Sequence, residues 1–439
     1  MDKNRNYIVA IALSVLVLVA WQYFYVGPKV AREQAAHNAA KQAATTTAPT
    51  PAKPQPQQNS NSQPAQPQQP HSNGSLPATA EGSGKPTSQS RAEVLAETKR
   101  VPVETPALSG SINLKGARLD DLKLNNYHVT VSNKSPRIAL LNPAQLAHGY
   151  FAELGYIGNA KSGTVPGPDT VWSVASGSKL TPSTPVTLTW TNDKGLTFTR
   201  KISVDDHFMF TVTDTVANSG AAPVSVTPYG RVTRFFKPDD RSSYLVHEGP
   251  IGYFGESGLK ETKYSSIEDD GTDVEPLAKN GWLGMADKYW ATAIVPRGDQ
   301  SFTGRFAYFK DGRPRYQTDF RSDPLTIAPG QSAKVEDLVF AGAKSVPVVN
   351  AYRDNLHIQH FDLLIDWGWF YFITKPMFRL MDFFYQLVGN FGIAIIMTTV
   401  VVKLIFFPRA NKSYSSMAKM KRIQPKMQEM KEKYGDDRM

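Results

Sequence analysis

The pattern of apolar and polar positions divides this chain into several segments. One of them is a long apolar stretch near the C-terminal end. It runs from Phe383 to Pro408, with no charged residue between Asp382 and Lys403. A membrane-spanning helix needs about 20 mainly apolar residues, with a lower limit near 17. Residues 391–408 therefore predict a short transmembrane helix that carries one cation, Lys403.

The position of Lys403 allows two interpretations. Lys403 lies five residues before Pro408, which corresponds to about 7.5 Å of helix rise, so its side chain could snorkel to the cytoplasmic headgroups. Alternatively it faces a hydrated cavity, because a charge at the bilayer centre costs roughly 2.5–3.5 kcal/mol and usually marks a functional site. The apolar stretch alone leaves both interpretations open.

A second apolar stretch lies near the start of the chain. Residues 7–26 contain no charge, and several aromatic residues between Trp21 and Tyr25 close the stretch. A signal peptide is the competing interpretation. The long apolar core, the aromatic belt and the lack of an adjacent cleavage site predict an uncleaved transmembrane anchor over residues 1–26. Lys3 and Arg5 precede it, which places the N-terminus in the cytoplasm and the following chain outside.

Residues 27–100 have the composition of a linker. Between Thr45 and Ser90 the only large apolar residue is Leu76, and the rest is mainly Pro, Gln, Ser, Thr, Asn and Ala. Such a segment cannot bury enough surface to offset its ordering entropy, and its prolines stiffen it locally. We expect a disordered tether without a binding role.

A strand pattern with a period of two residues fills residues 101–347. Val186, Leu188 and Trp190 alternate with threonines, a turn follows at residues 192–195, and alternation resumes from Leu196 to Val204. This pattern predicts a β-hairpin. Similar short strands recur up to residues 338–340, which indicates one large antiparallel β-sandwich on the outer side of the membrane.

No catalytic or metal-binding signature stands out in this β-region. The chain has no cysteine, which excludes thiolate metal sites, thiol catalysis and disulfides. The candidate acids and bases are His207, Asp239, Asp240, His247 and Glu248. None has a spacing typical of a metal site, a catalytic triad or a carboxylate pair, and no glycine-rich phosphate loop occurs. We interpret these residues as structural or surface groups and predict neither metal nor cofactor.

Residues 348–390 are apolar and aromatic but interrupted by charges. Trp367, Trp369 and Tyr371 cluster near the middle, and Pro376 breaks or kinks any helix that forms there. Charges recur every three to seven residues and leave an apolar face, which predicts an amphipathic helix in the outer membrane interface. A helix packed beneath the β-domain is the alternative, since it too buries one face.

Residues 409–439 form a basic segment with a helical stripe of methionines. They hold nine Lys/Arg and four Asp/Glu, and the net charge of the whole chain is +10. Because this segment directly follows an apolar helix, its charge indicates the cytoplasmic side rather than nucleic-acid binding. The stripe predicts either the seam of a helical hairpin or an adaptable partner surface. The candidate surface comprises Met417, Lys419, Met420, Lys421, Arg422 and Lys426.

Three groups of residues together resemble the YidC membrane-protein insertase family of Gram-negative bacteria. The first is Thr399-Val-Val-Val-Lys403, Pro408, Ser416-Met-Ala-Lys-Met420, Gln424-Pro425-Lys426 and Gly435-Asp-Asp437. The second is Gly281-Trp282 with Lys288-Tyr289-Trp290-Ala291-Thr292-Ala293, and the third is Asp366-Trp367-Gly368-Trp369-Phe370, Lys375-Pro376 and Gly389-Asn390-Phe391-Gly392. The resemblance covers essentially the whole chain.

The resemblance implies a non-enzymatic insertase and chaperone of the bacterial inner membrane. It implies a periplasmic β-supersandwich, distantly similar to sugar mutarotases, and a hydrophilic groove with a basic residue that attracts polar parts of an entering protein. Lys403 occupies that position, where the family commonly has Arg, and Thr399 lies one turn earlier on the same face. Lysine keeps the charge but lacks the guanidinium fork, so attraction and hydration are expected rather than a bidentate contact.

The partners implied are nascent membrane proteins, the lipid bilayer, the Sec translocon, and the ribosome or signal recognition particle pathway. Family members normally have five core helices, so the resemblance also suggests that Met439 falls within the first cytoplasmic hairpin. Two alternatives remain. One is a membrane-anchored carbohydrate-binding or sugar-modifying domain, and the other is a scaffold that tethers ribosomes or the translocon without inserting anything.

Overall fold

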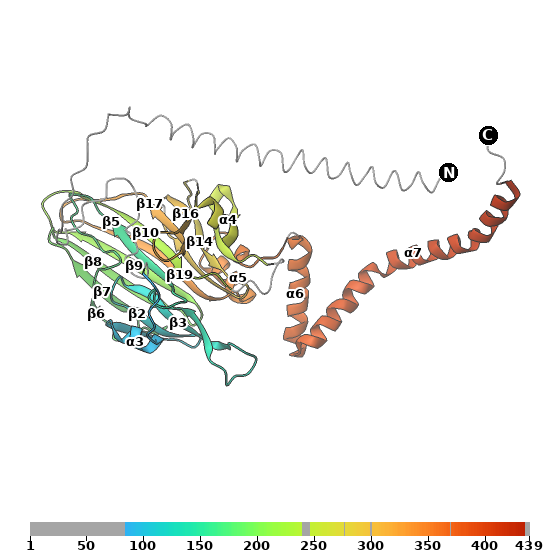
Figure 1. Cartoon of the computed structure of the whole chain (residues 1–439), viewed down its shortest axis with the longest axis horizontal. Helices are drawn as coiled ribbons and strands as arrows, with labels where there is room; N and C mark the ends of the chain where they lie inside the picture. The colour runs from blue at the N-terminus through green and yellow to red at the C-terminus, as the bar shows by residue number, and fades with distance from the viewer. Residues whose placement is uncertain (1–83, 239–245, 276, 299–300, 369, 435–439) are drawn as a thin grey trace, which may run out of the picture. The chain divides into compact units, whose positions relative to one another are not determined.

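The computed structural model describes residues 84–238, 246–275, 277–298, 301–368 and 370–434. The predicted anchor over residues 1–26 lies outside these residues, as do most of the predicted linker, Asp239, Asp240, Trp369 and the motif at 435–437. The described residues form a large β-domain followed by two long helices (Figure 1).

The described residues of the β-domain form nineteen strands. They are β1 (Arg100–Glu104), β2 (Leu108–Asn113), β3 (Arg118–His128), β4 (Arg137–Leu141), β5 (Tyr150–Ile157), β6 (Ser173–Ser176), β7 (Val186–Thr191), β8 (Leu196–Val204), β9 (Met209–Asn218), β10 (Val224–Arg234), β11 (Gly249–Phe254), β12 (Leu259–Glu261), β13 (Thr272–Val274), β14 (Gly281–Ala286), β15 (Trp290–Pro296), β16 (Phe302–Phe309), β17 (Arg315–Ser322), β18 (Leu325–Ile327) and β19 (Ser332–Ala343).

The helical elements are short until the end of the chain. They are α3 (Arg91–Ala96), η2 (Gly255–Ser257), α4 (Tyr264–Asp270), α5 (Val346–Asn355), η3 (Phe361–Leu364), α6 (Tyr371–Val388) and α7 (Phe391–Tyr434).

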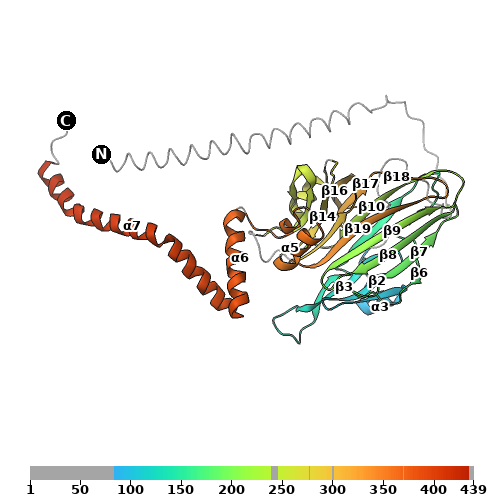
Figure 2. The same cartoon turned by 180° about the vertical axis from the view of Figure 1, so that it is seen from behind.

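Two antiparallel sheets make up the β-domain, which confirms the predicted sandwich. One sheet has ten strands in the order β1-β2-β3-β5-β10-β17-β16-β13, with β4 paired to β3 and β18 paired to β10. The other has nine strands in the order β12-β11-β14-β15-β19-β9-β8-β7-β6. Figure 2 shows the strands of the two sheets from behind. Many neighbouring strands are distant in the sequence, such as β19 beside β9.

The hairpin predicted from the alternating pattern is present. Strands β7 and β8 pair from Val186 opposite Ile202 to Thr191 opposite Thr197. The side chain of Asn192 accepts hydrogen bonds from the backbone N–H groups of Lys194 and Leu196, at 3.0 and 2.9 Å, and so stabilises the turn. The residues of β8 expected on one face are all buried.

The β-domain begins earlier and ends later than the sequence pattern predicts. Helix α3 lies within the predicted linker, and its Arg91 donates hydrogen bonds to Asp121 and to the carbonyl of Leu141. At the other end, η3 and most of α5 lie within the predicted interfacial region, yet Val349 and Phe361 are fully buried in the core of the domain. Burial of these side chains joins both segments to the sandwich, because removing apolar surface from water favours packing.

The last two helices continue through prolines at which the sequence predicts a break, a kink or an end. Pro376 lies inside α6, and both Pro408 and Pro425 lie inside α7, which is one helix of 44 residues. The predicted boundary at residue 408 is therefore not a helix end. Proline removes one hydrogen bond and bends a helix without necessarily ending it, and the axis of α7 changes direction along its length (Figure 1).

Candidate functional site

The candidate acids and bases of the β-domain have structural roles where they are described. His207 donates its backbone N–H to Asp205 at 3.0 Å, and Glu248 accepts the backbone N–H of Lys288 at 3.1 Å. Burial lowers the pKa of His247, whose ring Nε2 lies 3.1 Å from the carbonyl oxygen of Pro250. Among the described residues no cluster of three metal-ligating side chains occurs.

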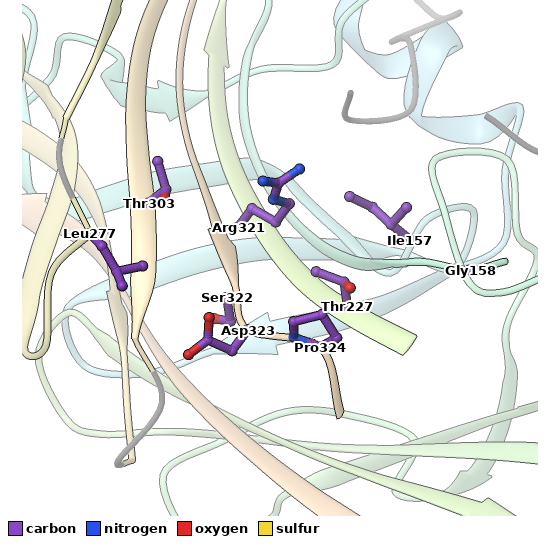
Figure 3. A pocket seen from close by; sticks show the side chains of 9 residues that line it. All are labelled: Ile157, Gly158, Thr227, Leu277, Thr303, Arg321, Ser322, Asp323 and Pro324. Carbon is purple, nitrogen blue, oxygen red and sulfur yellow. The ribbon is translucent and has the colours of Figure 1, made fainter. Parts of the chain in front are cut away.

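A cavity of about 470 Å³ opens at one end of the ten-stranded sheet. Figure 3 shows the nine side chains around it, among which Arg321 and Asp323 are the only charged ones. The remaining lining residues are Ile157, Gly158, Thr227, Leu277, Thr303, Ser322 and Pro324. A single carboxylate without a second acid or base gives this cavity no pair for general acid–base catalysis.

A row of alternating charges crosses the ten-stranded sheet. Arg118 of β3 pairs with Glu153 of β5 at 2.9 Å, and Glu153 pairs with Arg231 of β10 at 2.7 Å. Asp319 of β17 lies opposite Arg231 in the sheet and pairs with Arg305 of β16 at 2.9 Å. Because each of these charges has an opposite neighbour on an adjacent strand, we interpret the row as a structural ion-pair network and not as a reactive centre.

The pKa of Glu153 shows that its arginine neighbours affect this carboxyl more strongly than burial does. Burial on its own raises the pKa of this carboxyl, but the guanidinium groups of Arg231 and Arg118 outweigh burial and lower the pKa below its ordinary value. The hydroxyl of Tyr229 adds a hydrogen bond at 3.2 Å. Glu153 is therefore charged in the folded protein, and the ion pairs are complete.

The junction between the β-domain and α6 centres on Asp362. Lys375 of α6 forms an ion pair with its carboxylate, and Arg353 of α5 lies 3.6 Å away. Burial works to raise the pKa of Asp362, but the contacts with Lys375 and Arg353 lower it overall. Trp367 donates its indole N–H to the carbonyl of Asp362 at 3.1 Å and packs edge-on against Phe378 of α6.

The predicted interfacial residues thus divide between two environments. Trp367 is half-buried in the junction, whereas Tyr371 is 61% exposed at the start of α6. Trp369 lies outside the described residues. Helix α6 has no buried residue, so the described β-domain does not cover it.

A tight connection joins α6 to α7. Gly389 ends α6 in the left-handed conformation with φ of 65°, and its N–H donates to the carbonyl of Tyr385. The side chain of Asn390 accepts the N–H of Ile393 at 3.2 Å and so caps α7. Glycine adopts this conformation without steric cost, and Asn is a preferred N-cap, so the Gly-Asn pair turns the chain directly from one helix into the next.

Helix α7 presents two distinct faces near its start. Ala394 and Thr398 are buried at the contact with α6. Thr399 and Lys403 are exposed and lie four residues apart on another face, which at about 100° per residue points away from the α6 contact. The hydroxyl of Thr399 donates to the carbonyl of Ile395 at 2.8 Å. The structure therefore brings Thr399 and Lys403 together and leaves their face open to other partners.

Thr398 is a packed residue of α7 that the apolar pattern did not predict. Its hydroxyl donates to the carbonyl of Ala394 at 2.8 Å, and both side chains face α6. Two small residues four positions apart let membrane helices approach closely. This Ala-x-x-x-Thr spacing is the signal that distinguishes the packed face of α7 from the face of Lys403.

The second half of α7 carries the methionine and basic surface. Met417 and Met420 are 53% and 50% exposed, and the predicted basic residues around them are exposed as well. Within the described residues α7 contains a candidate membrane span that begins at Phe391. Since a 44-residue helix is about 66 Å long and the apolar core of a bilayer is about 30 Å thick, α7 is long enough to extend well beyond a membrane.

Comparison with known proteins decides the family. The family model described as YidC periplasmic domain matches residues 100–380, and the one described as 60Kd inner membrane protein matches residues 383–439. The membrane protein insertase YidC of Rhizobium meliloti is 57% identical over all of this chain and 71% of its own length, and that of Sinorhizobium medicae is 58% identical with the same coverage.

The chain belongs to the YidC family of membrane protein insertases. It is therefore an insertion factor of the inner membrane and not an enzyme, and the sugar-modifying alternative is not supported. A galactose mutarotase related enzyme from Lactobacillus acidophilus covers 55% of this chain and 97% of its own at 9% identity and a TM-score of 0.38. A likeness this weak supports no conclusion about sugar chemistry.

Proposed function

We propose that the face of α7 bearing Thr399 and Lys403 lines a hydrophilic groove through which this insertase admits the polar segments of its substrates. The observation that supports this most is geometric: the two residues share one exposed face, while the packed residues Ala394 and Thr398 lie on another. A cation on an otherwise apolar helix attracts acidic and polar groups and keeps water near it.

The groove lowers the barrier to insertion by an electrostatic and solvation effect. Moving a polar segment through hydrocarbon without hydrogen-bond partners is costly. Near Lys403 the segment keeps water and gains attraction to the ammonium group. The substrate's apolar helix then moves sideways into lipid, where burial of its apolar surface supplies the driving force. Neither nucleotide nor metal enters this scheme.

The orientation of the chain follows from its charges. The positive-inside rule assigns the basic second half of α7 to the cytoplasm and the β-domain to the periplasm. The sequence of residues 1–26, which lie outside the described part of the chain, predicts a further span with the N-terminus in the cytoplasm, so we propose that the protein crosses the membrane more than once. Helix α6, with exposed Tyr371 and Phe372 at its start, lies along the outer interface.

The cytoplasmic surface of α7 is proposed to receive partners that deliver substrates. It combines exposed methionines, which adapt to varied apolar surfaces, with Lys419, Lys421, Arg422 and Lys426. This chemistry suits nascent chains and the ribosome or signal recognition particle pathway. Cooperation with the Sec translocon is proposed for substrates that have large translocated segments.

The test is an insertion assay in cells that depend on this protein. Lys403→Ala should impair insertion of substrates with charged translocated segments by roughly tenfold or more, the factor expected when about 1.4 kcal/mol of stabilisation is lost. Lys403→Arg should restore insertion because it keeps the charge. The matched control is Lys412→Ala, which removes an exposed lysine further along α7. Unchanged insertion of every substrate by Lys403→Ala contradicts the proposal.

A further inference from the structure

The most exposed apolar side chain of the β-domain lies on one projecting hairpin. Strands β3 and β4 are joined by residues 129–136, and this hairpin projects from the sheets in both views (Figures 1 and 2). Val131 is fully exposed and Val129 is 63% exposed. β-Branched apolar residues at such a tip contribute little to the stability of the domain itself, because they bury no surface there.

The base of this hairpin contacts the turn between β14 and β15. The ring of Tyr127 packs edge-on against Trp290 at 5.1 Å, and Trp290 pairs with Ala343 at the end of β19. The next residue, Lys344, donates its backbone N–H to the carbonyl of Tyr289 at 2.9 Å. The hairpin and the β14–β15 turn therefore lie at the end of the nine-stranded sheet where β19 finishes.

The chain leaves the β-domain at this same end. Asp366 accepts the backbone N–H of His247 at 2.7 Å, just before β11, and the start of β11 pairs with the end of β14. Tyr371 of α6 lies only five positions after Asp366, a reach of at most about 18 Å. The ion pair of Lys375 with Asp362 also holds the second turn of α6 against the domain.

The hairpin carries the charge and aromatic character of a membrane-contacting surface. Residues 122–152 contain no Asp or Glu, whereas Lys123, Lys134 and Arg137 lie on or beside the hairpin and are exposed. Tyr289 is 59% exposed, and Lys288 lies over its ring. Tyrosine and tryptophan favour the membrane interface, and basic residues are attracted to anionic headgroups.

We propose that the tip of the β3–β4 hairpin and the β14–β15 turn dock on the outer surface of the bilayer and bind anionic lipid headgroups. We call these residues the hairpin surface: Tyr127, Val129, Val131, Lys134, Arg137 and Tyr289. The bilayer is the chosen partner because the short connection from Asp366 to α6 keeps it within reach, and because the charge of the hairpin complements anionic lipid. The inference rests on the proposed periplasmic orientation of the domain.

The contact would give the β-domain a second point of attachment. With only the Asp366–Tyr371 connection and the Asp362 junction, the domain could tilt about a single hinge. A second contact through Val131 and the basic residues fixes its orientation relative to α6. The hairpin surface thereby holds the domain over the region where substrates enter.

Fluorescent labelling of the whole chain tests this. The chain contains no cysteine, so Val131→Cys gives a single site for an environment-sensitive dye after reconstitution into vesicles that contain phosphatidylglycerol. The matched control is Val171→Cys, which is 62% exposed and pairs with Lys115 beyond the opposite end of β3. We expect lipid-borne quenchers to reduce the signal at 131 several times more than at 171.

Charge provides the second arm of the test. The pair of changes Lys134→Glu and Arg137→Glu should abolish most of the lipid quenching at 131, as should vesicles of purely zwitterionic lipid. Lys161→Glu with Lys194→Glu, two exposed lysines near the β7–β8 turn, should leave it unchanged. Equal water exposure at 131 and 171 overturns the inference. So does a dye at 131 that is shielded from aqueous quenchers but not reached by lipid quenchers, since protein would then cover the hairpin.

A third label separates this inference from the proposed function. A dye at Leu404→Cys, which is 66% exposed on a face of α7 about 100° from that of Lys403, reports whether that helix lies in lipid. If the dye at 404 is quenched by lipid and the dye at 131 is not, only the hairpin contact is wrong. If neither is quenched, the membrane arrangement itself is wrong.

Discussion

Lys375 of α6 forms an ion pair with Asp362, a residue of η3 whose side chain is only 7% exposed. This pair joins the last element of the β-domain to the first long helix beyond it. Trp367 lies between them, with its indole N–H bound to the carbonyl of Asp362 and its ring near the ammonium group of Lys375. The start of α6 is therefore fixed to the domain by a charged contact and an aromatic one.

The first prediction concerns this junction. Lys375→Ala should loosen the start of α6, because Asp362 then keeps only the longer contact with Arg353. We expect faster proteolysis around residues 366–370 and faster hydrogen exchange in the first turns of α6, with little change in the melting temperature of the β-domain. Arg379→Ala, an exposed change one turn further along α6, is the control. Equal protection in both variants would show that the ion pair does not hold the helix.

The second prediction concerns the charged row across the ten-stranded sheet. Glu153→Gln leaves two buried guanidinium groups, Arg118 and Arg231, without their shared counter-charge. Loss of one partner of a buried ion pair costs about 3–5 kcal/mol, so the free energy of unfolding should fall by about that amount. Asp169→Asn removes the carboxylate that pairs with Lys115 on the surface and should cost less than about 1 kcal/mol. Denaturant unfolding of both variants measures the difference.

The third prediction concerns pH and Asp337 of β19. Burial and the nearby Asp214 raise the pKa of Asp337 to about 8, because Arg200 is already bound to Asp214 by two hydrogen bonds. An acid with a raised pKa binds its proton more tightly when folded, so its ionisation destabilises the protein. Stability should therefore fall as pH rises from about 4, the ordinary value for Asp, towards 8.

Replacement of Asp337 tests that assignment. Asp337→Asn keeps the shape of the side chain but cannot ionise, so the melting temperature should rise by several degrees at pH 8.5 and change little at pH 4.5. Asp205→Asn, at the turn between β8 and β9, provides a comparison, although it loses a hydrogen bond with Tyr352 at every pH. A melting temperature for Asp337→Asn that follows the unmodified protein at both pH values would refute the raised pKa.

The sequence predicts a single hairpin correctly where alternating residues and a turn motif specify it. The β7–β8 hairpin follows from alternation and from the Asn-Asp-Lys-Gly turn, and Arg200, at an alternate position of β8, is buried on the same face as the apolar residues of that strand. The order of strands could not be predicted. Pairing such as β9 with β19 joins residues more than 100 positions apart, and alternation does not specify which strand becomes the neighbour.

The residues at which the β-domain and the helices begin and end could not be predicted from the sequence either. Val349 and Phe361 belong to the β-domain core because of contacts with distant residues, such as the packing of Phe361 on Phe340. Helix α7 continues through Pro408 although proline disfavours a helix interior. By contrast, the shared face of Thr399 and Lys403 follows directly from their spacing of four residues. That this face lines a groove was implied by the family resemblance, not by the spacing, and stays a prediction.

The central claim, that the face of Thr399 and Lys403 lines a hydrated groove, is tested most directly by water accessibility at position 399 in intact membranes. A membrane-impermeant thiol reagent should label Thr399→Cys in the assembled protein, because water reaches that face. It should not label Ile405→Cys, which is 65% exposed on the side of the helix nearer the α6 contact. Rapid labelling at 399 and none at 405 is the predicted result. Absence of labelling at both positions would contradict the account.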